Sequence, residues 1–263
     1  MAAPVHFLLH VPKCAGTTVE RHFETHLGTG FRIAPRWENI ARDVIGNRYP
    51  GIDVTGLRVV SGHSLSISLK AHFPDTEIRE SVLLRDPVGY LLSFYNYRWT
   101  RHGEGTGPRP PGFETWYARQ RRNPISRFLI TRYFEQGVPA LYRFSSASRL
   151  AWLEERLAGF FFVGSYRRAG EMIGGISREL GIPEDVKNRN VTPKKHLTKE
   201  ALGAGFIDRI LNDNPLDSAL YERWADRGWE GAPEAPRPAL PRFDQPRYAF
   251  GDLMTGLAKR VPI

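Results

Sequence analysis

The chain has 263 residues, of which 41% are hydrophobic and 12% aromatic, so it can bury a substantial core and lacks the composition of a disordered protein. Its 37 Lys and Arg residues outnumber 28 Asp and Glu residues, giving a formal net charge of +9. That excess favours an anionic partner such as a nucleotide, an acidic glycan, nucleic acid or a membrane surface, although a basic surface without a specific partner is the alternative. The single cysteine, Cys14, excludes an intramolecular disulfide and a cysteine-rich zinc site.

The first ten residues contain no basic segment and only a short apolar run. They predict a strand rather than a signal peptide or a membrane span. We therefore expect a cytoplasmic protein without an integral membrane segment.

Short apolar runs alternate with stretches of helical spacing, in an order typical of a parallel sheet covered by helices. The runs predict strands at residues 5–11, 57–60, 81–84 and 160–163. The stretches between them predict helices at residues 17–27, 87–100, 112–121, 125–136, 148–157 and 169–180, with two more between 198 and 229. We expect one α/β domain over residues 1–229.

Two segments rich in glycine or proline predict irregular structure. Residues 102–112 form either a substrate loop or an ordinary surface connection. In residues 231–247 proline recurs every few positions. We expect the extension 230–263 to pack on the domain or to trail from it.

The first predicted strand leads into Pro12-Lys13-Cys14-Ala15-Gly16-Thr17-Thr18 and then a helix. In open α/β sheets such a loop binds phosphate, because the free N–H groups of the helix start hold its oxygens. Gly16 allows close backbone approach, Thr17 and Thr18 add hydroxyls, and Lys13 adds positive charge. This is not a Walker A loop, whose lysine follows the last glycine. A glycine turn capped by threonine is the alternative.

A second element follows the strand at 81–84. Arg85 ends this strand, Asp86 is placed to cap the next helix, Pro87 suits its first position, and Ser93 lies about two turns in. An arginine and a hydroxyl near one point suit a terminal phosphate. A salt bridge between Arg85 and a neighbouring acid is the alternative.

Together the two elements resemble sulfotransferases that use 3′-phosphoadenosine-5′-phosphosulfate (PAPS), within the carbohydrate group that includes heparan sulfate 2-O- and 6-O-sulfotransferases and their bacterial relatives. The resemblance implies a single-domain, three-layer, P-loop-like fold, release of 3′,5′-ADP, and no metal. A Golgi member would carry an N-terminal anchor, so we expect a bacterial type.

The resemblance also implies roles for individual residues. The loop would hold the 5′-phosphosulfate and the second element the 3′-phosphate, with Arg85 and Ser93 in the latter role. Cys14 and Ala15 stand where better-known members often have Thr and Gly. Cys14 is either a reactive thiol or, as we expect, a small filler. The predicted donor-binding residues of the loop are Lys13, Cys14, Ala15, Gly16, Thr17 and Thr18.

A third element, Gly62-His63, resembles the Gly-His that follows the second strand in 2-O-type enzymes, where the histidine is the base. A sugar hydroxyl is a poor nucleophile near neutral pH, so a histidine within hydrogen-bond reach would take its proton. We therefore predict that His63 and Lys13 are catalytic. A purely structural strand-end histidine is the alternative.

Two later stretches resemble the family less closely. Residues 160–168 resemble its Phe-Val-Gly strand, and Tyr166 would approach the adenine. Asn190-Val-Thr192-Pro-Lys194 resembles a stretch that folds over the nucleotide, so Thr192 and Lys194 join the predicted donor site. The alternatives are a core aromatic and solvated lysines.

Other residues could in principle bind a metal or an acceptor, but their patterns are less specific. His22 and His26 have the spacing of helix-borne metal ligands, but no acidic motif accompanies them, so a solvated helix face is expected and no metal is assigned. A basic stretch interleaved with tryptophan is either an acceptor surface or a set of exposed helix faces; it comprises Arg98, Trp99, Arg101, His102, Trp116, Arg119, Arg121 and Arg122.

Sulfuryl transfer to a hydroxyl, on a glycan or glycoconjugate, is therefore the predicted function. A divergent nucleotide kinase is one rival, although it would need a Walker-type Gly-Lys-[Ser/Thr], which is missing from the sequence. A non-catalytic binder of nucleic acid or acidic glycan is another, but no nucleic-acid-binding motif supports it, so we expect no nucleic-acid partner. The position sulfated, the acceptor and the oligomeric state stay open.

Overall fold

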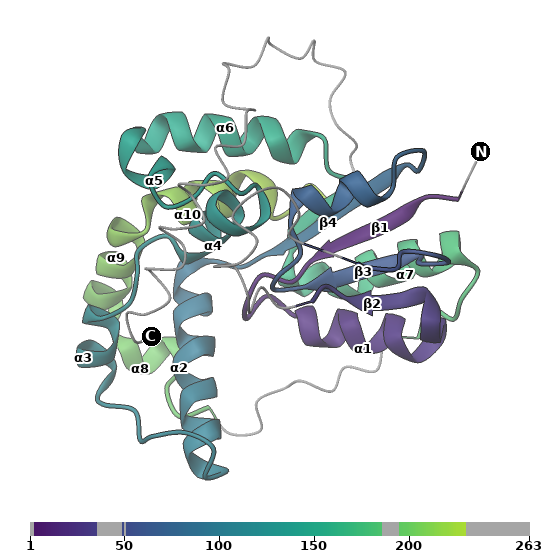
Figure 1. The fold of residues 1–263 in the computed structure, drawn as a ribbon. Helices are drawn as coiled ribbons and strands as arrows, with labels where there is room; N and C mark the ends of the chain where they lie inside the picture. Colours follow the sequence, from purple (N-terminus) through teal and green to yellow (C-terminus); the bar gives the residue numbers. More distant parts are fainter. Residues whose placement is uncertain (1–2, 36–48, 50, 186–194, 230–263) are drawn as a thin grey trace.

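The computed structural model describes residues 3–35, 49, 51–185 and 195–229. They form an α/β fold around a five-stranded parallel sheet, as the alternating sequence pattern predicts (Figure 1). The order of the strands across the sheet is β2-β3-β1-β4-β5. Their bounds are β1 Val5–Leu9, β2 Phe31–Ile33, β3 Val59–Gly62, β4 Ile78–Leu84 and β5 Phe162–Ser165. The predicted extension 230–263 lies outside the described residues.

Helices lie on both sides of this sheet (Figure 1). α1 and α7 lie side by side on one face, while α4, α6 and α10 cover the other. The helices are α1 Gly16–Leu27, α2 Pro87–Gly103, α3 Phe113–Ala118, α4 Pro124–Phe128, α5 Ala140–Arg143, α6 Ser146–Ala158, α7 Ala169–Leu180, α8 Lys199–Leu202, α9 Ala204–Asp213 and α10 Pro215–Trp224. The short 3-10 turns are η1 Gly28–Gly30, η2 Ile67–His72 and η4 Tyr166–Arg168, and η3 Leu129–Tyr133 is a π-type turn.

β1 is the central strand, and every residue of it is buried. Full burial on both faces explains why four of its five residues are apolar, because parallel strands covered by helices do not alternate with polar residues; the exception is His6. β1 pairs in parallel with β3 on one side and β4 on the other, with Leu8 opposite Ser61 and Ser81. The carboxyl ends of β3, β1, β4 and β5 therefore meet at one edge of the sheet.

Several elements differ from the sequence-based expectation: α5 was not predicted, and α8, α9 and α10 lie where two helices were expected. The short strand β2 was not predicted, because only Phe31 of its three residues is buried and an exposed edge strand has no apolar run. The helix predicted at 125–136 is α4 followed by the π-type turn η3. The turn places Tyr133 on the sheet, where its hydroxyl donates to the Glu80 carboxylate on β4.

α4 and α10 cap each other although they are distant in sequence. The side chain of Asn123 accepts from the N–H groups of Leu216 (2.9 Å) and Asp217 (3.1 Å) at the start of α10. In return, the Asp217 carboxylate accepts from the N–H groups of Ile125 (2.9 Å) and Ser126 (2.8 Å) at the start of α4. Burial raises the pKa of Asp217 to about 6. These caps satisfy helix-end donors that would otherwise be buried without acceptors.

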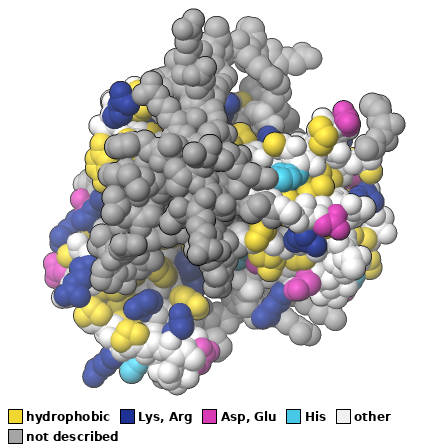
Figure 2. Space-filling model, viewed as in Figure 1, with side chains coloured by type: hydrophobic (Ala, Val, Ile, Leu, Met, Phe, Trp, Pro, Cys, Tyr) yellow, Lys and Arg dark blue, Asp and Glu magenta, His cyan; other side chains and the backbone are white. Residues whose placement is uncertain are grey.

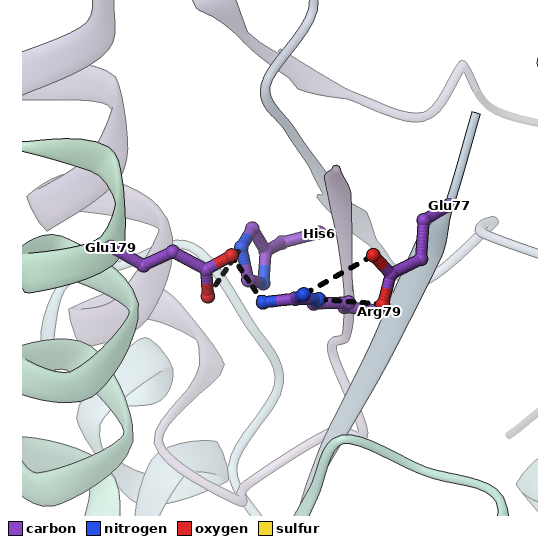
Figure 3. Close-up of polar contacts among 4 residues, drawn as sticks. All are labelled: His6, Glu77, Arg79 and Glu179. Atoms are coloured by element: carbon purple, nitrogen blue, oxygen red, sulfur yellow. Dashed lines mark hydrogen bonds and ion pairs between the residues drawn. The ribbon is translucent and has the colours of Figure 1, made fainter. Parts of the chain in front are cut away.

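A group of charged residues joins β1 and β4 to α7 on one face of the sheet (Figure 3). The guanidinium of Arg79 lies between the carboxylates of Glu77 (Nε to Oε1, 2.9 Å) and Glu179. His6 is fully buried on β1, and its Nε2 lies 3.5 Å from Oε2 of Glu179. Burial lowers the pKa of His6 to about 4, against an opposing effect of Glu179. His6 is therefore neutral in the folded protein near pH 7.

This burial predicts a pH dependence of stability. The unfolded chain binds a proton at residue 6 below pH 6.5, whereas the folded protein excludes it down to about pH 4, so stability falls as pH falls through this window. We expect wild type to lose up to about 3 kcal/mol more unfolding free energy over this window than His6→Leu. Urea unfolding at several pH values measures this, with His102→Leu as a control. Parallel pH profiles for wild type and His6→Leu would contradict it.

Candidate active site

The loop between β1 and α1 has an unusual backbone conformation. Lys13 and Ala15 both adopt left-handed conformations, with φ of 63° and 66°. Ala15 stands at the N-cap position of α1, so no side chain caps this helix, and the first turn contains no acid. Left-handed residues of this kind are strained and cluster at ligand-binding loops. The start of α1 thus has free N–H groups suited to an anion.

His10 packs directly against this loop. A Cβ atom on Gly16 would lie 2.0 Å from Cδ2 of the His10 ring, so only glycine fits at position 16. The ring is nearly buried, and its Nδ1 lies 2.7 Å from Oε1 of Glu20. The same Glu20 oxygen accepts from the hydroxyl of Ser61 on β3 (3.0 Å). His10 is therefore fixed between α1 and the neighbouring strand.

His63 follows β3 and lies beside His10. Its Nδ1 donates to the His10 carbonyl oxygen (2.7 Å), and the two ring centroids are 3.9 Å apart. A carbonyl only accepts, so Nδ1 carries the proton and Nε2 of neutral His63 has a free lone pair. Partial burial lowers the pKa of His63, and the neighbouring His10 lowers it further. The imidazole of His63 is partly enclosed but the residue remains accessible to solvent, so in its neutral form it is suited to accept a proton at neutral pH.

Arg85 reaches the same loop from the end of β4. Its Nη1 donates to the carbonyl oxygen of Lys13 (2.8 Å), and its guanidinium carbon lies 4.1 Å from the ring centroid of Tyr166. The buried Nε of Arg85 has no hydrogen-bond acceptor in the described part of the chain. Asp86 caps α2 by accepting from the N–H of Gly89 (2.7 Å), and Pro87 is the first helical residue, which confirms both predictions. No acid forms a salt bridge with Arg85 among the described residues.

The side chain of Lys13 extends over α2. Its Nζ lies 3.9 Å from the ring centroid of Tyr97, a residue that is 41% exposed. Burial lowers the pKa of Lys13, and the positive charge of Arg85 lowers it further. Cys14 is buried, and burial raises the pKa of its thiol well above the ordinary value. A neutral, buried thiol fits the expected filler rather than a reactive cysteine.

The remaining predicted donor-site residues occupy several places. Thr17 and Thr18 lie in the first turn of α1, with Thr17 exposed. Ser93 is half-buried on α2, two turns from its start, and Tyr166 begins the turn after β5. Thr192 and Lys194 lie outside the described residues. Strand ends therefore bring together the loop, His63, Arg85 and Tyr166.

The structure also shows the surroundings of His22, which has the spacing of a metal ligand. His22 is buried, and its Nε2 hydrogen-bonds the Ser177 hydroxyl on α7 (2.8 Å), so the expectation that it lies on a solvated face is wrong. It is buried because α7 packs beside α1. Across the described ranges, no group of three His, Cys, Asp or Glu side chains could hold a metal ion.

The basic stretch with tryptophans divides into two kinds of residue. Trp116 is buried among other aromatic rings, and Arg122 forms an ion pair with Asp213 (3.0 Å). Arg101 and Arg119 are exposed. Figure 2 shows Lys and Arg side chains gathered over α2, α3 and α9 on the viewed face. Part of the stretch is thus structural, and part is a basic surface.

The contact between Gly16 and His10 predicts the effect of one methyl group. We expect Gly16→Ala to displace the His10 ring and to lower the unfolding free energy by roughly 1–3 kcal/mol, as overpacking does. Gly170→Ala is the matched control, because a Cβ atom there, also in the first turn of a helix, meets open space. Urea unfolding compares the two variants with wild type. Equal stability of both variants would show that position 16 tolerates a side chain.

Comparisons with protein-family models, curated proteins and solved structures find no match for this chain. Among the helices of the described ranges, none is both long and apolar enough to cross a membrane.

Proposed function

We propose that this protein is a sulfotransferase that moves the sulfuryl group of PAPS to an acceptor hydroxyl, on a carbohydrate. The observation that carries the proposal is the convergence of three groups on adjacent strand ends: the loop at Lys13, the guanidinium of Arg85 and the imidazole of His63. Two hydrogen bonds to the loop backbone tie them together, from Arg85 to the Lys13 carbonyl and from His63 to the His10 carbonyl.

The strand order supports a nucleotide site at this edge and a P-loop-like fold. Along the chain, β3 lies on one side of β1 and the next strand, β4, lies on the other, so the direction of the sheet connections reverses at β1. In open α/β sheets ligands bind outside the carboxyl ends of the strands at such a reversal. Loop N–H groups and the threonine hydroxyls would hold the 5′-phosphosulfate, and Arg85 with Ser93 would bind the 3′-phosphate.

The proposed reaction is an in-line displacement at sulfur. The acceptor oxygen forms a bond to sulfur as the bond from sulfur to the 5′-phosphate oxygen breaks, and Nε2 of His63 takes the hydroxyl proton. Lys13 stabilises the charge that develops on the departing phosphate oxygen. The products are a sulfate ester and 3′,5′-ADP.

The two rival functions account for less of this geometry. A nucleotide kinase would need a lysine after the loop glycine, but position 17 is threonine and Lys13 precedes Gly16. A non-catalytic binder would explain the basic surface and the anion loop, yet it gives no reason for a neutral histidine with a free Nε2 beside that loop. The His63 geometry therefore favours an enzyme that removes a proton.

Nucleotide selectivity tests the donor site. We expect 3′,5′-ADP to raise the melting temperature of wild type more than ADP or ATP, because a ligand that binds only the folded state stabilises it. In Arg85→Ala the affinity for 3′,5′-ADP should fall roughly 10- to 100-fold, the effect of a lost charged hydrogen bond, while ADP binding changes little. Arg143→Ala removes the same charge from an exposed position on α5 and serves as the control.

Two results would contradict the donor assignment. A wild-type preference for ATP would favour the kinase instead. Equal loss of affinity for ADP and 3′,5′-ADP in Arg85→Ala would place the arginine away from the 3′-phosphate.

Loss of the base tests the chemistry. We expect His63→Ala to reduce transfer of labelled sulfate from PAPS to a glycan acceptor roughly 10²- to 10⁴-fold, with 3′,5′-ADP affinity nearly unchanged. In wild type kcat/KM should fall at acid pH, with a midpoint below the ordinary histidine value of 6.5, because protonated His63 cannot accept a proton and its surroundings lower its pKa. His26→Ala is the control histidine. A large loss of nucleotide affinity in His63→Ala would assign His63 to binding instead.

A further inference from the structure

The two cations of the candidate site share one feature: each lies over a tyrosine ring. Nζ of Lys13 is 3.9 Å from the ring centroid of Tyr97, and the guanidinium carbon of Arg85 is 4.1 Å from that of Tyr166. Within residues 3–35, 49, 51–185 and 195–229, neither Lys13 nor Arg85 forms an ion pair. The tyrosines come from two different elements, α2 and the turn after β5.

Several other half-buried cations of this protein pair with acids instead. Arg79 lies between two carboxylates (Figure 3), and Nζ of Lys70 is 2.7 Å from Oε2 of Glu80. Arg168 pairs with Glu171 (2.7 Å). Ring contacts are common to many cations of this chain, but these three also have a carboxylate, whereas Lys13 and Arg85 have only the ring. Arg132 also lies over a ring, that of Phe128 (5.8 Å to its centroid), with no carboxylate partner among the described residues, but this contact is longer than those of Lys13 and Arg85.

The difference has a physical consequence for ligand binding. A carboxylate beside Lys13 or Arg85 would cancel its charge and compete with an incoming phosphate for the same N–H donors. A ring face attracts a cation through its quadrupole but accepts no strong hydrogen bond, so the donors stay available. No carboxylate or other acceptor among the described residues occupies the buried Nε of Arg85.

We propose that Tyr97 and Tyr166 are positioning residues that hold Lys13 and Arg85 in place for an anionic nucleotide while leaving their charge unneutralised. This inference rests on the proposed function and deepens it. It gives Tyr166 a role different from adenine contact, because its ring is engaged by Arg85. It also adds Tyr97, which the sequence did not single out.

The two tyrosines should act on different parts of the nucleotide. Tyr97 supports the cation assigned to the 5′-phosphate, so its loss should weaken binding of every adenosine 5′-nucleotide. Tyr166 supports the cation assigned to the 3′-phosphate, so its loss should weaken only nucleotides that carry this group. A general structural defect would not separate the ligands in this way.

Calorimetric titration of four variants tests this separation, with 3′,5′-ADP and adenosine 5′-phosphosulfate as probes. We expect Tyr97→Leu to weaken binding of both probes roughly two- to fivefold, the effect of an exposed cation–π contact. Tyr166→Leu should weaken only 3′,5′-ADP by a similar factor. Tyr97→Phe and Tyr166→Phe keep the ring and should bind like wild type. Tyr142→Leu, at a tyrosine that is 76% exposed, is the control.

A second measurement tests the contact without a ligand. In protein labelled with ¹³C-lysine, the ring current of Tyr97 should shift the ε-methylene proton signal of Lys13 upfield, and Lys13→Arg identifies this signal. The shift should persist in Tyr97→Phe and vanish in Tyr97→Leu. An unshifted signal in wild type would overturn the role of Tyr97.

The outcomes separate this inference from the proposed function. If wild type binds neither probe, the proposed function fails and the inference fails with it. If wild type prefers 3′,5′-ADP but the leucine variants bind it equally well, only the tyrosine inference is overturned. Phenylalanine variants as weak as the leucine variants would also overturn it, because the hydroxyl and not the ring would then be responsible.

Discussion

The contact between the His10 ring and Gly16 is the constraint on which the rest of the site depends. The ring occupies the space of a Cβ atom at position 16, so the loop can reach the start of α1 only where the residue is glycine. The carbonyl of His10 orients His63, and Glu20 holds the opposite edge of the His10 ring. One buried side chain thus joins the anion loop to the proposed base, and the distance between them is set by packing rather than by a flexible connection.

Much of the fold follows from the sequence because its strong signals are local. Residues 7–9 of β1 and 82–84 of β4 are apolar runs, and Asp86 with Pro87 marks the start of α2. Parallel pairing then brings the ends of these strands to one edge, so the convergence of the loop with His63 and Arg85 could be anticipated. The edge strand β2 could not be predicted, because its residues lack a pattern that distinguishes them from a loop.

The supporting contacts of the site could not be predicted, since they join residues distant in sequence. Glu20 and Ser61 meet only after β1 and β3 pair, and nothing in their own neighbourhoods marks them as partners of His10. Tyr97 has ordinary helical spacing, and its contact with Lys13 depends on where α2 begins. His22 was assigned to a solvated face because the packing of α7 beside α1 has no signature in the sequence.

The mutual capping of α4 and α10 has a consequence for how the chain matures. The N–H groups at the start of α4 donate to the carboxylate of Asp217. This residue lies 91 positions after Ser126 in the sequence. During synthesis the middle of the chain emerges from the ribosome long before that acceptor exists, so these donors stay bonded to water until α10 arrives. Closing so long a loop is slow and has an entropic cost. The sheet edge formed by β1, β3 and β4 can therefore assemble first, and the layer over its other face is completed only once α10 has been synthesised.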